Sequence, residues 1–427
     1  MFQPDVETLP RADLTRLQEE RWRRLFERLE RSPFYRGRIT VTHGMQAHPL
    51  DAVADLPFTY KHDLREHYPW GLLAVERDQV ARLHASSGTG GKPTVVSYTR
   101  GDLNVWAELC ARALAMAGAR PGDRIHNAYG YGLFTGGLGL HQGAELLGAT
   151  VVPASGGATR RQVTLIADLE PDGLCCTPSF AWALAETMRE MGYDPRETSL
   201  RYGVFGAEPW TEAMRERIEA AFSIVALDIY GLSEIVGPGV AMECREGRRG
   251  LHVAEDHIYP EVVNPVTGEV LPPGERGELV LTTLSKEAMP LLRYRTGDLV
   301  SLYDDGCLCG RTHRRISRVL GRGDDMLIVR GVNVFPSEVE RVLLSFGQLA
   351  AHYQLVWEDG RLDRLRVEVE TSATLPAAQV SPLERAVTER LRQELGVRVE
   401  TTVMPPGSLP RPEGKAVRVV DRRTRSS

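Results

Sequence analysis

One octapeptide dominates this 427-residue chain: Ser86-Ser87-Gly88-Thr89-Gly90-Gly91-Lys92-Pro93. Its glycines let the backbone turn several N–H groups toward one point, because no Cβ obstructs the approach. Such a nest of amides favours an anion, above all a polyphosphate. The hydroxyl groups can donate to the same phosphate oxygens, and Lys92 adds positive charge. The octapeptide therefore predicts a site for a nucleoside triphosphate.

The octapeptide differs from a Walker A loop. That motif has a glycine, four residues and then Gly-Lys-Ser/Thr. Here Ser86 stands where the first glycine should be, and Pro93 replaces the hydroxyl residue that binds magnesium. Both differences argue against a P-loop NTPase. Runs of Gly, Ser and Thr are also common in plain surface loops, so the rest of the chain has to separate the two interpretations.

The composition excludes several classes of protein. Hydrophobic residues make up 42% and charged residues 26%, which is ordinary for a soluble globular protein with more than one domain. The net charge of −5 gives no electrostatic reason to expect a nucleic-acid or membrane partner. The six cysteines do not suggest a disulfide scaffold, and neither a signal core nor a long apolar run occurs. We expect a cytoplasmic protein.

The periodicity of apolar residues predicts an α/β fold. From about residue 102 to 230, short apolar runs alternate with helical patterns, which indicates parallel βαβ units with helices on both faces of a sheet. An arginine-rich amphipathic helix is expected over 14–31. The other predicted helices are 102–117 and 136–147, and the predicted strands are 124–129, 149–153, 173–177 and 202–205.

The remainder of the chain divides into two further regions. Turn signals separate short strands from about 257 to 320 and predict a β-rich subdomain. Beyond it, a helix over 336–346, a strand at 365–369 and a helix opened by Ser381-Pro382 and ended by Gly396 predict a small α+β domain. We therefore expect an N-terminal domain over 1–322 and a C-terminal domain over 323–427.

Four more motifs follow the octapeptide in a definite order. They are Asp228-Ile229-Tyr230-Gly231-Leu232-Ser233-Glu234, Tyr294-Arg295-Thr296-Gly297-Asp298, Gly321-Arg322-Gly323-Asp324-Asp325 and the segment 407–415 that ends in Gly414-Lys415. Taken alone, each of these motifs is typical of an ordinary turn or an exposed charged residue. Together they resemble the adenylate-forming superfamily over nearly the whole chain. The resemblance implies a large N-terminal α/β domain with a β-rich subdomain and a small mobile C-terminal α+β domain.

Longer stretches narrow the resemblance to the phenylacetate–CoA ligase family. They are Asn127–Gly137, Phe205-Gly206-Ala207-Glu208-Pro209-Trp210, Gly237–Glu243 and Arg330-Gly331-Val332-Asn333-Val334-Phe335-Pro336-Ser337. One difference lies in the octapeptide, where many family members have a second threonine in place of Gly90. The change removes one hydroxyl donor but keeps the amide nest, so ATP binding is still expected.

The resemblance implies ATP, Mg²⁺ and coenzyme A as ligands and gives individual residues their roles. Glu234 would lie near Mg²⁺, a cation that often keeps several waters beside one carboxylate. Tyr230 would face the adenine, Asp298 would accept the ribose hydroxyls, and Lys415 would bridge the carboxylate and the α-phosphate. The remaining nucleotide-binding residues implied are Ser86, Ser87, Gly88, Thr89, Gly90, Lys92, Ala207, Glu208, Asp228, Gly231, Ser233 and Arg322.

The implied reaction has two steps. A carboxylate attacks the α-phosphorus of ATP and gives an acyl-AMP and pyrophosphate; a thiol then attacks the acyl carbon and releases AMP. The resemblance implies that the C-terminal domain rotates between the steps about Asp324 and brings Arg330-Gly331 toward the CoA channel.

A neutral aryl group is the expected acyl cargo. Small, aromatic and apolar residues fall in the stretches that match the family's acyl pocket, and no extra cation accompanies them: Tyr131, Phe134, Gly136, Ala207, Ile235 and Pro238. The aromatic members could equally belong to the core. Phenylacetate is the first choice, and hydroxyphenylacetate, indole-acetate and anthranilate-type acids remain open.

Cys244, His252, Cys307 and Cys309 predict a structural zinc site. Three thiolates and one imidazole suit tetrahedral Zn²⁺, although the spacing differs from that of zinc fingers. His257 or His313 is an alternative to His252, and four unrelated side chains are the simpler interpretation. The other cysteines lie in apolar runs and are expected in the core.

Two classes of function remain. The first is an acid–thiol ligase with CoA, or a carrier protein, as the acceptor, and the family resemblance implies a homodimer. The second is a nucleotide-binding protein without catalysis, which the presence of Glu234, Asp298 and Lys415 disfavours. A dehydrogenase is disfavoured because Gly130-x-Gly132 has Thr135 where a third glycine should be.

Overall fold

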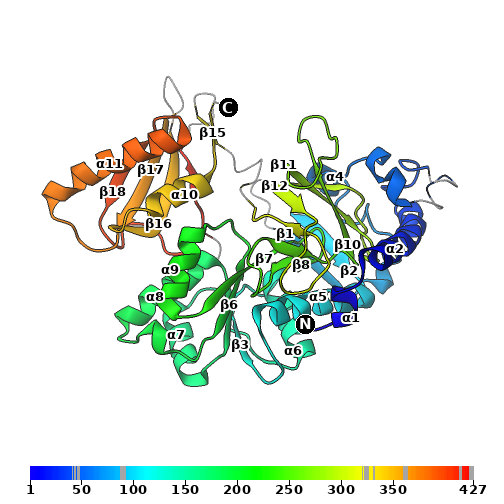
Figure 1. Cartoon of the computed structure of the whole chain (residues 1–427), viewed down its shortest axis with the longest axis horizontal. Coiled ribbons are helices and arrows are strands. Elements are labelled where there is room, and N and C mark those ends of the chain that lie inside the picture. Colours follow the sequence, from blue (N-terminus) through cyan, green and yellow to red (C-terminus); the bar gives the residue numbers. More distant parts are fainter. Residues whose placement is uncertain are drawn as a thin grey trace.

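The computed structural model describes residues 1–40, 42, 45, 49–86, 93–319, 321, 327–329, 332–358, 364–412 and 416–422. Eleven strands form one long sheet in the larger, N-terminal part, in the order β10-β11-β12-β13-β9-β8-β7-β6-β5-β3-β4. A smaller C-terminal domain, gold to red in Figure 1, lies next to α9 of the larger part. The predicted α/β class is confirmed.

Half of the long sheet is parallel, as the alternating pattern predicts. Strands β4, β3, β5, β6 and β7 pair in parallel, and helices cover both faces, because α5 and α6 bury their side chains in one apolar core and α7, α8 and α9 in another. The bounds are β3 Arg124–Asn127, β4 Thr150–Val152, β5 Gly173–Cys176, β6 Tyr202–Gly206, β7 Val225–Leu232, α5 Arg100–Ala117, α6 Gly136–Leu147, α7 Thr159–Leu169, α8 Pro178–Glu190 and α9 Glu212–Phe222.

The other half is antiparallel and contains the predicted β-rich region. Its strands are β8 Gly237–Glu243, β9 Leu251–Val253, β10 Ile258–Val263, β11 Arg276–Thr283, β12 Tyr294–Tyr303 and β13 Arg315–Ile316. They continue the long sheet through the β7–β8 pair rather than forming a sheet apart. The alternation of apolar residues predicts strands here but carries no information on their partners.

The N-terminal segment packs along this antiparallel half (Figure 1). The predicted amphipathic helix is α2, Arg11–Arg31, and it buries Trp22, Leu25, Phe26 and Leu29 in the main core. Three short elements follow: α4, Lys61–Glu66, and the hairpin of β1, Arg82–Ser86, with β2, Thr94–Tyr98. The minor elements are α1 Pro4–Glu7, η1 Pro49–Asp55, η2 Arg77–Gln79 and η3 Pro195–Glu197.

The C-terminal domain has its own four-stranded sheet and core. Strands β18, β17, β16 and β19 are neighbours in that order, and two helices pack on the sheet. The bounds are β14 Leu327–Val329, β15 Val332–Val334, α10 Pro336–Leu344, β16 Leu349–Glu358, β17 Arg364–Thr371, α11 Ala377–Leu395, β18 Glu400–Met404 and β19 Val419–Asp421. The predicted boundary between residues 322 and 323 lies outside the described residues.

One predicted helix start in this domain is wrong. Helix α11 begins at Ala377, not at Ser381, and therefore contains Pro382. Proline removes one backbone hydrogen bond from a helix interior. Before the proline, Val380 packs against the domain's core, and after it the stripe of Leu383, Val387, Leu391 and Leu395 is buried. Apolar burial on both sides of Pro382 offsets the lost bond.

The two domains meet on α8 and α9 (Figure 1). Leu344 and Ala351 of the C-terminal domain join the apolar core of those helices. Arg217 donates to the backbone oxygens of Leu344 and Leu349, each at 3.0 Å, and Glu186 accepts from His352 at 2.6 Å. Among the described residues, no helix combines the length and the apolar character that a membrane crossing requires.

Candidate active site

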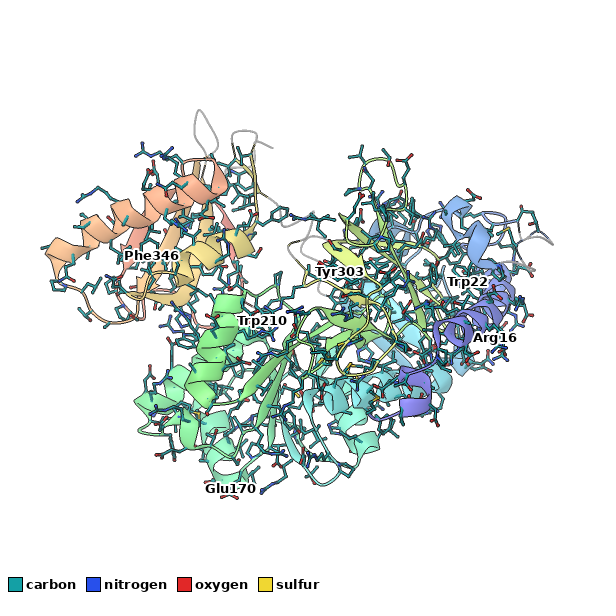
Figure 2. All side chains as sticks on the ribbon, in the orientation of Figure 1. Arg16, Trp22, Glu170, Trp210, Tyr303 and Phe346 are labelled. Atoms are coloured by element: carbon teal, nitrogen blue, oxygen red, sulfur yellow. The ribbon has the colours of Figure 1, made fainter. Side chains whose placement is uncertain are left out.

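A cleft of about 650 Å³, including its part open to solvent, lies where the ends of β6 and β7 approach β12. Figure 2 labels Trp210, one of its wall residues, on the side that faces the C-terminal domain. Six residues predicted to bind the nucleotide line this cleft: Ala207, Glu208, Asp228, Tyr230, Gly231 and Asp298. Their motifs are far apart in the sequence, and the sheet brings them together beyond the carboxyl ends of parallel strands, where α/β proteins bind ligands.

The backbone of the cleft is shaped at two positions. Ala207 follows β6 with a φ of +69°, an unusual conformation for a residue with a side chain. Only glycine fits at position 231, because a Cβ there would lie 1.8 Å from the backbone oxygen of Gly237. The close approach of β7 and β8 therefore requires a glycine at this point of the cleft wall.

Tyr230 and Asp298 link the two halves of the site. The phenol of Tyr230, on β7, donates to Oδ2 of Asp298, on β12, at 2.5 Å. A bulge supports this geometry: between the pairs Glu278–Leu299 and Val280–Arg295, β12 advances four residues while β11 advances two. Gly297, with a φ of +77°, lies inside that bulge.

A charged layer lies under the cleft. Arg215 binds Glu243 at 2.6 Å, and the guanidinium groups of Arg215 and Arg318 lie over the Trp210 ring at 5.2 and 4.9 Å. Burial and the neighbouring Glu243 raise the pKa of Asp228. These contacts tie Trp210, a residue of the cleft wall, to β8 and to Arg318. Single charged residues in apolar strands gave no signal of this arrangement in the sequence.

Hydrogen bonds from two buried side chains fix the backbone of the turn at Ser233, Glu234 and Ile235. Tyr98 donates to the backbone oxygen of Ser233 at 3.1 Å, and Lys286 donates to those of Glu234 and Ile235 at 3.1 and 2.5 Å. Lys286 is only 2% exposed, and burial lowers its pKa to about 8. The carboxylate of Glu234, itself 5% exposed, lies 3.9 Å from Nζ of Lys61.

Sequence reasoning missed both Lys61 and Lys286, although a signal was present. Only four of the 52 basic residues are lysines, namely Lys61, Lys92, Lys286 and Lys415. Two of them belong to the predicted nucleotide motifs, and the other two contact Glu234. Lysine is a compact cation on a long stem, and arginine does not replace it at such positions without a change of geometry.

Part of the predicted site lies outside the described residues, namely Ser87, Gly88, Thr89, Gly90, Lys92, Arg322, Asp324, Arg330, Gly331 and Lys415. At the edge of the octapeptide, Ser86 ends β1, and its buried Oγ has no hydrogen-bond partner among the residues that the structure describes. The hydroxyl of Ser233 bonds that of Thr135 at 3.1 Å.

Of the predicted acyl-pocket residues, Ala207 alone is among those that line this cleft. The others belong to the loop before α6 and the start of that helix, or to the turn after β7 and the start of β8. Tyr131 accepts from Asn127 at 2.8 Å, Phe134 is 43% exposed, and Ile235 is wholly buried in the core. Gly136 and Pro238 lie nearby in the fold: a Cβ on Gly136 would meet the Phe134 ring at 2.6 Å, and the Pro238 oxygen accepts from Trp106 at 3.1 Å.

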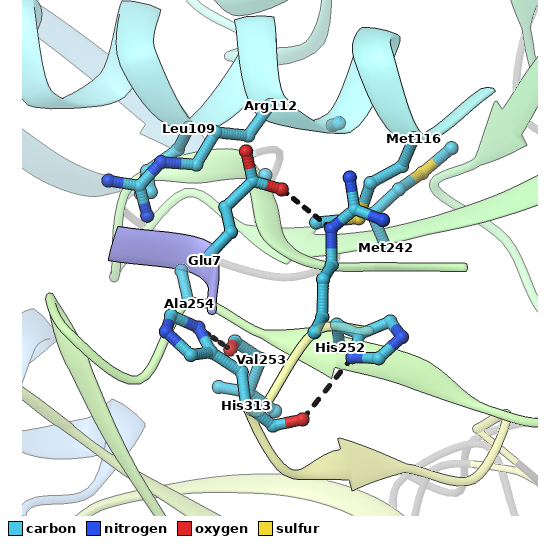
Figure 3. Close-up of a pocket in the computed structure, with 12 residues that line it drawn as sticks. Glu7, Leu109, Arg112, Met116, Met242, His252, Val253, Ala254 and His313 are labelled. Carbon is cyan, nitrogen blue, oxygen red and sulfur yellow. Dashed lines mark hydrogen bonds and ion pairs between the residues drawn. The ribbon is translucent and has the colours of Figure 1, made fainter. Parts of the chain in front are cut away.

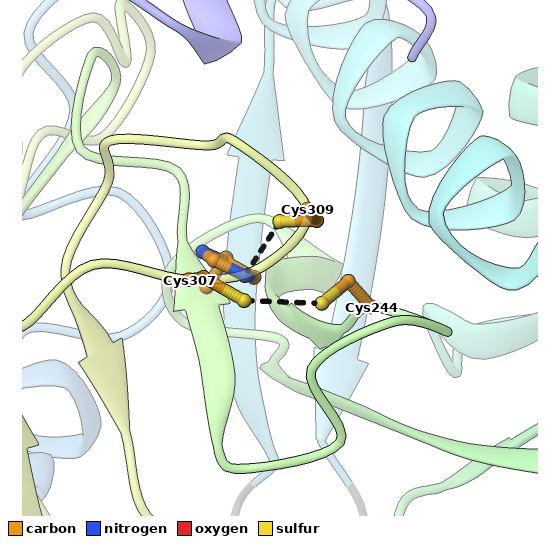
Figure 4. Close-up of side chains that lie close together, drawn as sticks. Cys244, Cys307 and Cys309 are labelled. Carbon is orange, nitrogen blue, oxygen red and sulfur yellow. Dashed lines mark hydrogen bonds between the residues drawn. The ribbon is translucent and has the colours of Figure 1, made fainter.

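The four predicted metal ligands form one cluster (Figure 4). The ligand atoms of Cys244, His252, Cys307 and Cys309 all lie within 4.8 Å of one another. The Cys244 and Cys307 sulfurs are 3.5 Å apart, and Cys309 Sγ is 3.4 Å from His252 Nε2. Ligands of a tetrahedral zinc ion lie about 3.8 Å apart, so these side chains fit such an ion with small adjustments.

The surroundings of His252 explain why this histidine, and not its neighbours, faces the three cysteines. Its Nδ1 contacts the backbone oxygen of His313 at 3.2 Å (Figure 3). This contact leaves Nε2 free to face the sulfur of Cys309. His313 contacts backbone oxygens with both nitrogens, and His257 contacts Ser285 and Asp256. The alternatives of His257 or His313 as ligand are therefore wrong. A small cavity behind His252 is closed by Glu7, which accepts from Arg311 at 2.6 Å (Figure 3).

Comparison with known proteins assigns the chain to a family. Residues 45–285 match the AMP-binding enzyme family, and residues 331–423 match the AMP-binding enzyme C-terminal domain. A phenylacetate–coenzyme A ligase of Thermus thermophilus is 53% identical over 99% of this chain and 100% of its own length. The corresponding ligase of Escherichia coli is 50% identical over 98% of this chain and 97% of its own length.

A solved structure gives the same fold and a domain arrangement. A 2-hydroxyisobutyryl-CoA ligase in its postadenylation state superposes with a TM-score of 0.92 at 30% identity, covering 98% of this chain and 91% of that one. The same enzyme in its thioesterification state, with CoA, gives 0.73 at 31% identity, with 98% and 92% covered. The domains here are arranged as in the postadenylation state. The chain belongs to the phenylacetate–coenzyme A ligase family of AMP-binding, adenylate-forming enzymes.

Proposed function

We propose that this chain joins phenylacetate to coenzyme A at the expense of ATP. The observation that carries the proposal is the cleft lined by Tyr230 and Asp298, in a chain about half identical to phenylacetate–coenzyme A ligases over nearly its full length. The turn at Glu234 follows directly on β7, the strand that bears Tyr230. The aryl group requires no buried counter-charge, in keeping with the small, aromatic and apolar residues 131–136 and 235–238.

The first step forms a phosphorus–oxygen bond. A carboxylate oxygen of the acid attacks the α-phosphorus, and the bond from that phosphorus to the bridging oxygen breaks, releasing pyrophosphate. Two anions have to approach each other, so positive charge and hydrogen-bond donors must already be in place. We assign the charge at the reacting oxygens to Lys415, and that near the leaving phosphates to the octapeptide 86–93 and Lys61.

The nucleotide is oriented by its base and its sugar. Tyr230 would lie against the adenine, with the Ala207-Glu208 segment along its edge, and Asp298 would accept from the ribose hydroxyls. The hydrogen bond from Tyr230 to Asp298 supports the proposed contact between Asp298 and the ribose, since it holds the carboxylate in one position before the nucleotide binds.

Glu234 would hold Mg²⁺ with retained waters. Its carboxylate is almost fully buried, and the turn that bears it is fixed by Lys286, so the donor set suits a hard cation. When bound, the cation would neutralise phosphate charge. In the second step the CoA thiolate attacks the acyl carbon, the thioester forms, and AMP leaves with the bridging oxygen; Asp324 and Arg330-Gly331 would serve the domain rotation and the CoA channel.

We infer three further properties. The Cys244, His252, Cys307 and Cys309 cluster binds zinc in a structural role, because its four ligand atoms are prearranged. The enzyme works in the cytoplasm, in keeping with its unpaired cysteines, and it is a homodimer. Light scattering of the purified protein tests the last point.

A panel of acids tests the proposed function. Purified protein with ATP, Mg²⁺ and CoA is given phenylacetate, 4-hydroxyphenylacetate, indole-3-acetate, anthranilate, benzoate or 2-hydroxyisobutyrate, and pyrophosphate release is measured. We expect the highest kcat/KM with phenylacetate, and CoA-dependent AMP release without any carrier protein. Failure of every aryl acid to release pyrophosphate would contradict the proposal.

A further inference from the structure

Both carboxylate oxygens of Glu208 are occupied by backbone donors from the two domains. Oε1 accepts from the N–H of Ser179, in the first turn of α8, at 2.8 Å. Oε2 accepts from the N–H of Ala416, in the C-terminal domain, at 2.8 Å. Glu208 itself follows β6, in the segment that lines the nucleotide cleft. A single side chain therefore connects the cleft, α8 and the C-terminal domain.

The bond to Ser179 orients the carboxylate independently of the C-terminal domain. Helix α8 has 13 residues, and its N-terminus is also capped by Thr177, which accepts from Phe180 at 3.3 Å. The unbonded N–H groups and the dipole at a helix N-terminus both favour a negative charge there. Oε2 is thus presented in a fixed direction as a charged acceptor, and hydrogen bonds to charged acceptors are stronger than neutral ones.

The bond to Ala416 acts on the backbone directly after Lys415. The alanine side chain contributes no polar group, so this contact fixes the course of the chain rather than a side chain. Two residues later Arg418 turns inward and contacts Glu340 at 3.3 Å, and Glu340 accepts from Thr211 of the N-terminal domain at 3.0 Å. Glu208 and Thr211 therefore bind the C-terminal domain from one short segment.

The other polar contacts between the domains lie elsewhere. Arg217 binds the end of α10 and the start of β16, and Glu186 binds His352. These contacts hold the two domains together at α10 and β16, far in the sequence from Lys415. The Glu208 contact, in contrast, is made to Ala416, the residue directly after Lys415. The arrangement in which it occurs is the one that resembles the postadenylation state of the 2-hydroxyisobutyryl-CoA ligase, with a TM-score of 0.92 against 0.73 for the thioesterification state.

We propose that Glu208 is a positioning residue for the adenylate-forming step: its carboxylate holds the chain beside Lys415 in place while the acyl-AMP forms and releases that chain for the thioester step. The inference rests on the proposed function. It differs from an adenine-binding role for the Glu208 side chain, because acyl-AMP and ATP share the adenine, and loss of an adenine contact would impair both steps.

The two half-reactions, measured separately, test the proposal with Glu208→Gln. The amide keeps the size of the side chain but has only one acceptor oxygen. It therefore cannot accept from the N–H groups of Ser179 and Ala416 on separate oxygens, as the carboxylate does. Adenylation is followed as phenylacetate-dependent exchange of pyrophosphate into ATP, and thioester formation as conversion of synthetic phenylacetyl-AMP with CoA. We expect the adenylation rate to fall about 10- to 100-fold and thioester formation to change less than about threefold.

Glu186→Gln is the matched control, because it weakens another carboxylate contact between the same domains, to His352. We expect it to leave both half-reactions within about threefold of wild type. Equal losses in both half-reactions of Glu208→Gln, or equal effects of the two variants on adenylation, would overturn the proposal. A wild-type protein that performs neither half-reaction would contradict the proposed function instead, so the two failures are distinguishable.

Discussion

The Tyr230 phenol donates a hydrogen bond of 2.5 Å to Oδ2 of Asp298, and this bond joins β7 of the parallel half of the sheet to β12 of the antiparallel half. The two residues are 68 positions apart in the sequence. They come together because the sheet is continuous through β8, β9 and β13. The bond makes Asp298 an oriented acceptor on one wall of the cleft that we propose binds the nucleotide.

Asp298→Asn should weaken the binding of ATP far more than it slows turnover. An amide has one acceptor oxygen instead of two and carries no charge, so it cannot accept from both ribose hydroxyls as well as from Tyr230. We expect the KM for ATP to rise about 10- to 100-fold, with a smaller fall in kcat. Steady-state kinetics with varied ATP measure both constants. Asp304→Asn, an exposed aspartate just beyond β12, is the control, and an equal effect of the two substitutions would contradict the role of Asp298.

Lys415→Ala should abolish acyl-AMP formation and largely spare thioester formation from supplied phenylacetyl-AMP. In the proposed mechanism the lysine acts where charge develops between the carboxylate and the α-phosphate, and that charge is absent once the adenylate exists. Pyrophosphate exchange and thioester formation are measured separately, with Arg392→Ala as an exposed cation control in the same domain. Equal loss of both half-reactions would remove Lys415 from the adenylating role.

Protein purified without a chelator should contain about one zinc ion per chain, as four prearranged ligands predict. Cys309→Ala should lose the metal and lower the melting temperature. Without the ion, the turn that contains Cys307 is no longer connected to Cys244 at the end of β8. Cys176→Ala, a buried cysteine outside the cluster, should keep the metal. Metal analysis decides the point: less than about half an equivalent of zinc in the wild type would count against the site.

Glu255 makes the stability of the N-terminal part depend on pH. Burial alone would raise the pKa of this carboxyl, but Arg314 and Arg11 hold it at about 2, against an ordinary value of 4.5. A carboxylate with a lowered pKa stabilises the fold above its unfolded pKa, and this contribution is lost as the pH falls through 4.5 toward 2.

Glu255→Gln tests this dependence. The advantage of wild type over the variant, measured as the free energy of unfolding in urea, should shrink by about 1 kcal/mol between pH 7 and pH 4. Glu20→Gln, an exposed glutamate on α2, should show no such change. A difference between wild type and Glu255→Gln that stays constant over this range would contradict the pKa assignment.

The sequence predicted those parts of the molecule that depend on local pattern. The alternation of strands and helices from α5 to α9 follows from apolar periodicity and glycine caps, such as Gly118 after α5, and the structure bears it out. Strand partners do not follow from periodicity, so the union of β10 to β13 with the main sheet could not be predicted. The early start of α11 likewise could not be predicted, because the packing of Val380 against the core arises only in the folded domain, whereas Pro382 is a local stop signal.

The candidate site divides in the same way. Asp228, Tyr230 and Asp298 belong to motifs, and the cleft contains all three. Lys61 and Lys286 are single residues without a motif, and their relation to Glu234 arises only when α4 and the β11–β12 turn fold against β7. The one signal of these two residues in the sequence was the rarity of lysine. The chain has 52 lysines and arginines, and only four of them are lysines.

Transfer of a carboxylate oxygen tests the adenylation mechanism most directly. Phenylacetate labelled with a heavy oxygen isotope in its carboxylate group is incubated with the protein, ATP, Mg²⁺ and CoA, and the products are analysed by mass spectrometry. Attack of the carboxylate on the α-phosphorus predicts one labelled oxygen in each AMP, unlabelled pyrophosphate and one phenylacetyl-CoA for each AMP. Unlabelled AMP, or labelled inorganic phosphate formed together with ADP, would contradict the account.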